Sequence, residues 1–140
     1  MGFVHLIISS AMENRVDKFL PLAFKAIDKV KVDNNSFVQR DGKIPKEYKG
    51  YISSLGANIV QAGVKAAITF YEAEESGSKS DRRLINAAIK YILTNPNPEP
   101  ENYSDCKLTN LLGGDIQQKA LEILDAATAL KLALRTYTMS

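Results

Sequence analysis

The sequence has few of the side chains on which metal and nucleophilic chemistry depend. It contains one cysteine, one histidine and no tryptophan in 140 residues. Zinc sites need several clustered His or Cys ligands, and a nucleophile needs a neighbouring base. Cys106 and His5 lie far apart in the sequence, and Glu72, Glu74 and Glu75 are typical of a solvated helix end. We therefore expect no catalytic residue, no metal and no cofactor, and we interpret Cys106 as a small buried hydrophobe.

Long hydrophobic runs are also missing. The longest apolar run near the start, Phe3 to Ile8, is interrupted by His5 and is too short to span a membrane. It lacks the basic residues that begin a signal peptide. A single cysteine cannot form an internal disulfide, which favours a reducing compartment. We expect a soluble cytoplasmic protein that does not contact membranes.

A strong excess of one charge is absent as well. The chain has 18 basic and 16 acidic residues, giving a net charge of +2. A free-standing DNA-binding protein usually has a larger basic excess. Any contact with nucleic acid must then come from a local patch, or be shared with partner proteins.

No segment shows the alternation typical of strands, and no repeat is found. The apolar spacings are helical, so we predict an all-α fold, a compact single-domain bundle of five to six helices without a sheet. We assign this domain to residues 13–140 and treat residues 1–12 as an N-terminal extension, because Met12-Glu13 looks like a natural start. Alternatively, Phe3 to Ile8 form an opening helical turn that packs on the body.

Breaking residues divide the chain into predicted helices. Pro21 should kink or restart the first helix, Gly56 should bend the second, and Ser80 should cap the fourth. The predicted ranges are 13–32, 45–55, 56–75, 81–93, 107–112 and 116–137, with a flexible break at 76–80 and an extended connector at 94–100. Asp115 should cap the last helix, whose buried face should start at Ile116.

The most distinctive stretch runs from Tyr48 to Tyr71. Its second half has an apolar helical stripe that other helices should cover, formed by Ile59, Val60, Gly63, Val64, Ala67, Ile68 and Tyr71. The glycine at its centre should let a neighbouring backbone pack closely.

The basic residues allow two interpretations. Lys43, Lys46 and Lys49 flank the start of a predicted helix, and Arg82 and Arg83 occupy the first turn of another. Lys90, Lys107, Lys131 and Arg135 complete the set. One interpretation is an ordinary surface of mixed charge, with Asp81 offsetting the two arginines. The other is a groove that binds nucleic-acid phosphates independently of sequence, for which the candidates are Lys43, Lys46, Lys49, Arg82, Arg83, Lys131 and Arg135.

The Tyr48–Tyr71 stretch also resembles a known family. Tyr48-Lys49-x-Tyr51, then Leu55, Ile59-x-Gln61-x-Gly63-Val64 and Phe70-Tyr71 are similar to the signature region of the small helical subunit of type III-B CRISPR (Cmr) effector complexes. The similarity extends in order over roughly residues 13–137. The last helix departs from the family pattern, since it has Lys131 but no aromatic residue in the corresponding segment.

The resemblance implies a non-catalytic structural subunit for antiviral defence. Members stack along the repeated backbone subunits and help line the channel that holds guide RNA and target RNA. It implies protein partners within the complex, contacts to the RNA backbones and weak self-stacking as a further option. Two alternatives remain open: a helical protein-interaction adaptor with no nucleic-acid role, and a small enzyme of another type.

Overall fold

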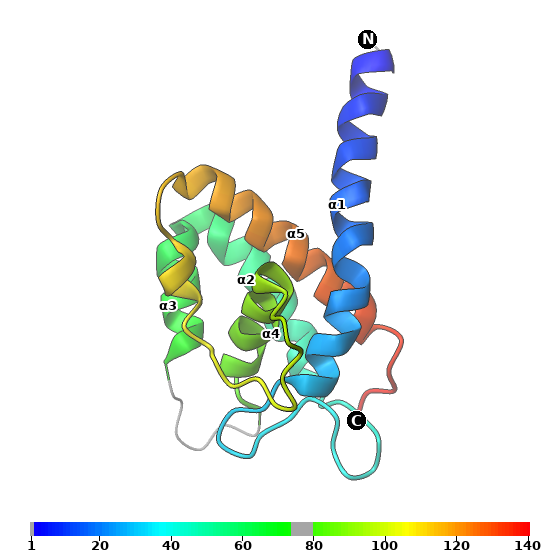
Figure 1. Cartoon of the computed structure of the whole chain (residues 1–140), viewed down its shortest axis with the longest axis vertical. Coiled ribbons are helices and arrows are strands. Elements are labelled where there is room, and N and C mark those ends of the chain that lie inside the picture. The colour runs from blue at the N-terminus through cyan, green and yellow to red at the C-terminus, as the bar shows by residue number, and fades with distance from the viewer. Residues whose placement is uncertain (1, 74–79) are drawn as a thin grey trace.

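A computed structural model describes residues 2–73 and 80–140, with side chains for residues 15–73 and 80–140. Over these ranges the chain forms five α-helices and one 3-10 helix, joined by loops (Figure 1). The elements are α1 (Gly2–Lys29), α2 (Glu47–Ala62), α3 (Val64–Glu72), α4 (Arg83–Thr94), η1 (Leu108–Leu111) and α5 (Ile116–Leu134). Only isolated bridges, and no strands, occur in the part described. The predicted all-α fold is confirmed.

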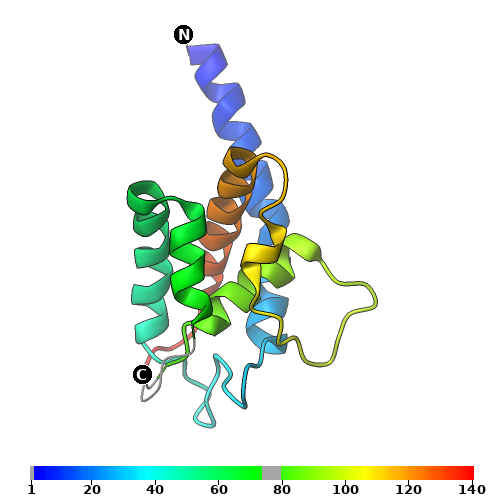
Figure 2. The ribbon, with the colours of Figure 1, turned by 90° about the vertical axis from the view of Figure 1, so that its left-hand side faces the viewer.

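Helix α1 is continuous through Pro21. The predicted restart at this residue is therefore wrong. Proline removes the hydrogen bond that its N–H would donate to the carbonyl four residues earlier, here that of Asp17. Both Pro21 and Asp17 are exposed, so water can reach that carbonyl. Residues 2–12 belong to the same helix, which extends past the rest of the molecule in Figures 1 and 2.

The break in the second predicted helix lies at Gly63 and not at Gly56. Gly56 is inside α2, whereas Gly63 separates α2 from α3 with φ 93° and ψ 156°. This conformation is one that glycine adopts far more readily than other residues. The predicted close approach at Gly63 is wrong, because a Cβ there would meet nothing within 4 Å. Figure 2 shows α2 and α3 side by side as a hairpin on the outside of the molecule.

The predicted stripe of Tyr48–Tyr71 is buried in most of its positions. Val60 is the exception among its large side chains, with 79% of its surface exposed. Tyr48 and Tyr71 are buried and hydrogen-bonded: the hydroxyl of Tyr71 donates to the carbonyl of Tyr51 at 2.7 Å, and the backbone N–H of Asp81 donates to the hydroxyl of Tyr48 at 3.0 Å. The first bond joins α3 to α2 within the hairpin, and the second joins α2 to the segment just before α4.

Helix α4 lies at the centre of the bundle. Residues 84–92 are buried without interruption, and α4 packs against each of the other α-helices and η1. Ser80 is not its N-cap, contrary to the prediction. The Oδ1 of Asp81 instead accepts a hydrogen bond from the backbone N–H of Arg83 at 3.0 Å. The segment after α4 is irregular and mostly exposed, as predicted.

Helix α5 begins at the predicted cap. The Oδ1 of Asp115 accepts a hydrogen bond from the backbone N–H of Gln118 at 3.2 Å. Ile116 is half exposed, so the prediction that it starts the buried face is wrong. The helix ends at Leu134, earlier than predicted. The predicted flexible break at 76–80, and with it Glu74 and Glu75, falls largely outside the described residues.

Candidate nucleic-acid interface

The seven basic residues predicted to bind phosphate separate into two groups. Lys43, Lys46, Lys49, Lys131 and Arg135 lie where the start of α2 meets the end of α5. The N–H of Ile44 donates to the carbonyl of Thr138 at 3.0 Å, and the N–H of Ser140 donates to the carbonyl of Ile44 at 3.0 Å. These bonds hold the two chain segments together. Arg82 and Arg83 lie at the start of α4, beside α3 and the loop after α1.

Helix register places three of the first group, Lys49, Lys131 and Arg135, along one groove. Lys43 and Lys46 precede α2, and Lys46 lines a neighbouring hollow with Glu47, Ser80 and Ser140. On α2, Ser53, Gly56 and Val60 follow Lys49 at helical spacings of four, seven and eleven residues, so the four share a face. On α5, the same spacings relate Leu124 to Thr128, Lys131 and Arg135. A shallow cavity of about 130 Å³ lies between these faces, lined by Ile52, Ser53, Gly56, Leu124, Ala127, Thr128 and Lys131. We call this the α2–α5 groove.

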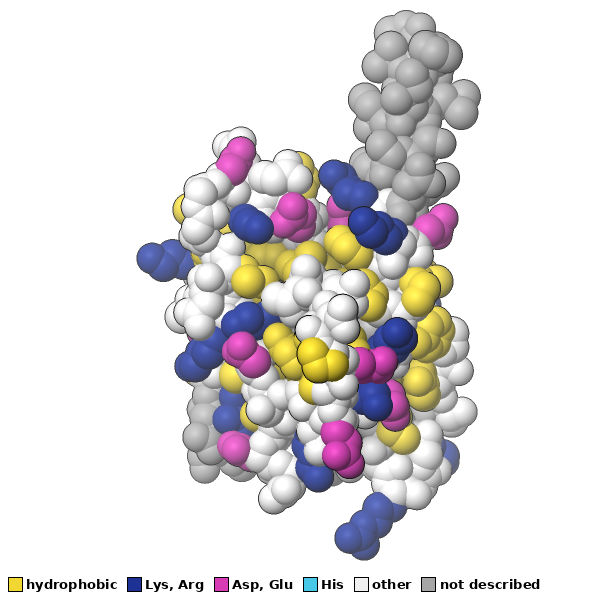
Figure 3. All heavy atoms as spheres, viewed as in Figure 1, with side chains coloured by type: hydrophobic (Ala, Val, Ile, Leu, Met, Phe, Trp, Pro, Cys, Tyr) yellow, Lys and Arg dark blue, Asp and Glu magenta, His cyan; other side chains and the backbone are white. Residues whose placement is uncertain are grey.

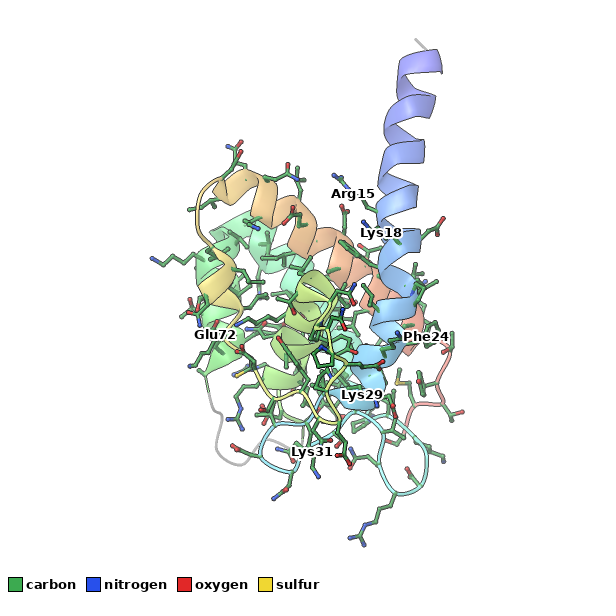
Figure 4. The ribbon with its side chains drawn as sticks, viewed as in Figure 1. Arg15, Lys18, Phe24, Lys29, Lys31 and Glu72 are labelled. Carbon is green, nitrogen blue, oxygen red and sulfur yellow. The ribbon has the colours of Figure 1, made fainter. Side chains whose placement is uncertain are left out.

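Positive charge along this groove is not neutralised within the described residues. None of the five basic side chains of the first group forms an ion pair there. The two acidic residues of α5 form ion pairs with other basic residues. The Oδ2 of Asp125 lies 2.7 Å from the Nε of Arg15, and the Oε2 of Glu122 lies 3.5 Å from the Nζ of Lys119. Figure 4 shows Arg15 extending from α1 beside α5. The cationic end of the groove is therefore available to an anion.

Arg83 is held by carboxylates of its own chain. Its Nη2 lies 2.6 Å from Asp81 and 2.9 Å from Asp33, and its side chain is 13% exposed. Burial works to raise the pKa of Asp81, but hydrogen bonds from Arg83 and Asn35 outweigh it and lower that pKa overall. The hydrogen bonds that the Arg83 guanidinium donates to Asp81 also raise the pKa of Arg83. This guanidinium stabilises the junction of α4 with the loop after α1.

Arg82 has different surroundings. Its guanidinium carbon lies 4.1 Å from the centroid of the Phe70 ring and 5.9 Å from that of Tyr71, both on α3. Helix α3 meets α2 through Tyr51, which is on a different face of α2 from Lys49 and Ser53. Arg82 is thus placed apart from the α2–α5 groove.

Lys90 and Lys107, the two other basic residues noted in the sequence, both contact Asp105. Lys90 is 7% exposed, and its Nζ lies 2.7 Å from the Oδ2 of Asp105. Burial works to raise the pKa of Asp105, but the hydrogen bond from Lys90 outweighs it and lowers that pKa. Lys107 is exposed, and its backbone N–H also donates to Asp105. Lys90 therefore ties α4 to the segment before η1.

The small side chains of the groove were not among the predicted site residues. Ser53, Gly56 and Thr128 keep the cavity open between α2 and α5. Their spacing from Lys49 and Lys131 was visible in the sequence, but the pairing of α2 with α5 was not.

The face seen in Figure 3 lacks the character of a phosphate-binding surface. Lys and Arg side chains are interspersed there with Asp and Glu.

Among the described side chains, no group of three His, Cys, Asp or Glu residues is placed to hold a metal ion. Cys106 is half-buried, and burial raises the pKa of its thiol. In the described part of the chain, no helix has the length and apolar character needed to cross a membrane.

Comparison with known proteins gives one match. A family model described as "CRISPR-associated protein (Cas_Cmr5)" matches residues 21–138, which is most of the chain. No curated protein and no solved structure matches.

Proposed function

The chain belongs to the Cas_Cmr5 family, the small helical subunits of the type III-B Cmr effector complex, and on that premise we propose that it is a non-catalytic subunit that contacts RNA backbones. In this proposal it stacks along the repeated backbone subunits and helps line the channel for guide RNA and target RNA. Weak stacking between copies of the chain is part of the same proposal. Nucleotide and cleavage chemistry belongs to other subunits.

One observation supports the RNA contact most directly: the cationic end of the α2–α5 groove. Lys49, Lys131 and Arg135 lie along it and Lys43 and Lys46 lie near it, and none of the five forms an ion pair in the described part of the molecule. RNA phosphates carry one negative charge per nucleotide, and basic side chains bind them without reading the bases. The groove is shallow, which suits a backbone contact better than the enclosure of a small molecule.

This proposal refines the predicted set of phosphate contacts. Lys43, Lys46, Lys49, Lys131 and Arg135 are proposed to face RNA. Arg83 is proposed to act within its own fold, because two carboxylates already bind its guanidinium. Arg82 is proposed as a secondary contact at most, on a separate surface beside Phe70.

The test is to neutralise the groove in the assembled complex. A variant carrying Lys46→Gln, Lys49→Gln, Lys131→Gln and Arg135→Gln is co-expressed with the other subunits, and target-RNA binding is measured by filter binding at several salt concentrations. We expect assembly to be retained and RNA affinity to fall, by about tenfold or more at low salt, because each phosphate contact contributes through counterion release.

The matched control also removes four positive charges, by replacing Lys18, Lys25, Lys31 and Lys107 with Gln. All four lysines are exposed on described parts of the surface away from the groove. Equal RNA affinity of the groove variant and the control would contradict the RNA contact. Failure of the unaltered chain to co-purify with any backbone subunit would contradict the proposed place in the complex and would favour an adaptor role outside it.

A further inference from the structure

A second concave surface lies on the outer side of the α2–α3 hairpin. It is a groove of about 250 Å³ lined by Asn58, Ala62, Ala66, Ala67 and Phe70, and we call it the α2–α3 slot. Ala62 and Ala66 are exposed, and 54% of the surface of Phe70 is exposed. Figure 2 shows the hairpin on the outside of the molecule, with no other element in front of it.

Among the residues that the structure describes, few charged side chains surround the slot. Between Gly50 and Tyr71 the only charged residue is Lys65, which is exposed on α3. One further cation, the guanidinium of Arg82, lies over the Phe70 ring at the slot's edge. An apolar floor with the exposed Lys65 at its rim fits an apolar side chain flanked by a carboxylate.

Charge also argues against two other occupants. RNA would lose hydration at the uncharged floor and would find few cations there to bind its phosphates. A second copy meeting the slot symmetrically would bring two Lys65 side chains together, and like charges at an interface are unfavourable. Another protein chain suits the slot better than either.

We propose that the α2–α3 slot docks an apolar side chain from the repeated backbone subunit, with an acidic residue of that subunit near Lys65. This rests on the proposed function, since it names the surface by which the chain would stack on its neighbours. The small side chains of Ala62 and Ala66 let the partner's backbone approach closely, and Phe70 forms one wall of the contact. Two sides of α2 then have different partners: the side at the α2–α5 groove contacts RNA, and the side at the α2–α3 slot contacts protein.

The first test is site-specific crosslinking. A photo-reactive phenylalanine analogue replaces Thr69, an exposed residue of α3 next to Phe70, and the complex is assembled from the co-expressed subunits and irradiated. We expect a crosslink to the backbone subunit. A crosslink to RNA, to a second copy of this chain, or only to a subunit other than the backbone subunit would overturn the inference.

The second test is a charge placed in the slot. Ala66→Glu is at an exposed helical position, so the chain should still fold, but docking would bury an unpaired carboxylate. We expect recovery with an affinity-tagged backbone subunit to fall by about tenfold, with the melting temperature of the isolated variant unchanged. The matched control is Lys18→Glu, at an exposed position on α1, a helix outside both the α2–α3 hairpin and the α2–α5 groove.

The outcomes separate this inference from the proposed function. Normal recovery of the Ala66→Glu variant would overturn docking at the slot and leave membership of the stack untouched. Equal loss in both glutamate variants would also overturn it, since the effect would not be specific to the slot. If the unaltered chain is not recovered with the backbone subunit at all, the proposed stacking itself fails and docking at the slot fails with it.

Discussion

Arg82 and Arg83 are adjacent in the sequence, yet their side chains have different partners. Arg83 is bound to Asp81 and Asp33, whereas Arg82 lies over Phe70. The sequence made the pairing with Asp81 foreseeable, because the two residues are close in the chain. The contact with Asp33 was not foreseeable, since it depends on the path of a loop 50 residues earlier. Both arginines were predicted to bind phosphate because of their charge. The structure distinguishes them, because their side chains have different partners.

At this scale we predict that Asp81→Asn destabilises the fold. The amide oxygen can still accept the hydrogen bond from the backbone of Arg83, but the charge that pairs with its guanidinium is lost. We expect the free energy of unfolding at pH 7 to fall by about 1 kcal/mol, a typical value for one hydrogen bond. Urea denaturation measures the change, with Asp17→Asn, an exposed residue of α1, as the control.

The pH dependence of this effect has a definite sign. The pKa of Asp81 is lower in the folded protein than its ordinary value, so its ionised form stabilises the fold. That contribution is complete above the unfolded-state pKa of about 3.9 and is lost as pH falls through the folded-state pKa. The stability difference between the wild type and Asp81→Asn should thus shrink when urea denaturation is repeated at pH 3. A difference that grows with acidity would contradict the ion pair.

At the scale of elements, the α2–α3 hairpin shows what periodicity can predict. The helical stripe was foreseeable from the spacing of Ile59, Val64, Ala67 and Tyr71, all of which are buried. The position of the break was not, because Gly56 and Gly63 are both plausible breaking residues. Only the packing of both helices against the rest of the bundle selects Gly63 for the positive φ.

The two glycines should respond in opposite directions to alanine. Gly63→Ala forces a side chain into a φ of 93°, and strained backbone conformations of this kind cost about 1–3 kcal/mol. Gly56→Ala sits inside α2 with open space around its Cβ, and this change should stabilise the fold by about 0.5–1 kcal/mol. Thermal unfolding of both variants measures the difference. Stabilisation by Gly63→Ala would show that the break lies elsewhere.

At the scale of the whole molecule, the centre of the bundle is α4. Residues 84–92 are buried on all sides, including Asn86, whose Nδ2 donates to the carbonyl of Ile68 at 2.9 Å. In the sequence this segment reads as an ordinary amphipathic helix, because Arg83, Asn86 and Lys90 suggest a solvated face. Its neighbours supply the partners that allow Lys90 and Asn86 to be buried. Such partners come from distant segments, so periodicity cannot reveal them.

The candidate interface also depends on the packing of segments that are distant in the sequence. Helix register predicts that Lys49 shares a face with Ser53 and Gly56, and that Lys131 shares one with Arg135. The antiparallel pairing of α2 with α5, which brings these faces to one groove, required the structure. The surface that results carries its basic side chains unpaired within the described residues, while the visible face of Figure 3 mixes both signs.

The central claim is that the α2–α5 groove contacts RNA phosphates, and salt dependence tests it most directly. For the assembled complex, the logarithm of the RNA-binding constant is plotted against the logarithm of salt concentration for the wild type and for the four-residue groove variant. Each lost phosphate contact should reduce the slope by about 0.7–0.9, so the variant should show a slope shallower by about 3. An unchanged slope would contradict the claim, even if the affinity itself fell.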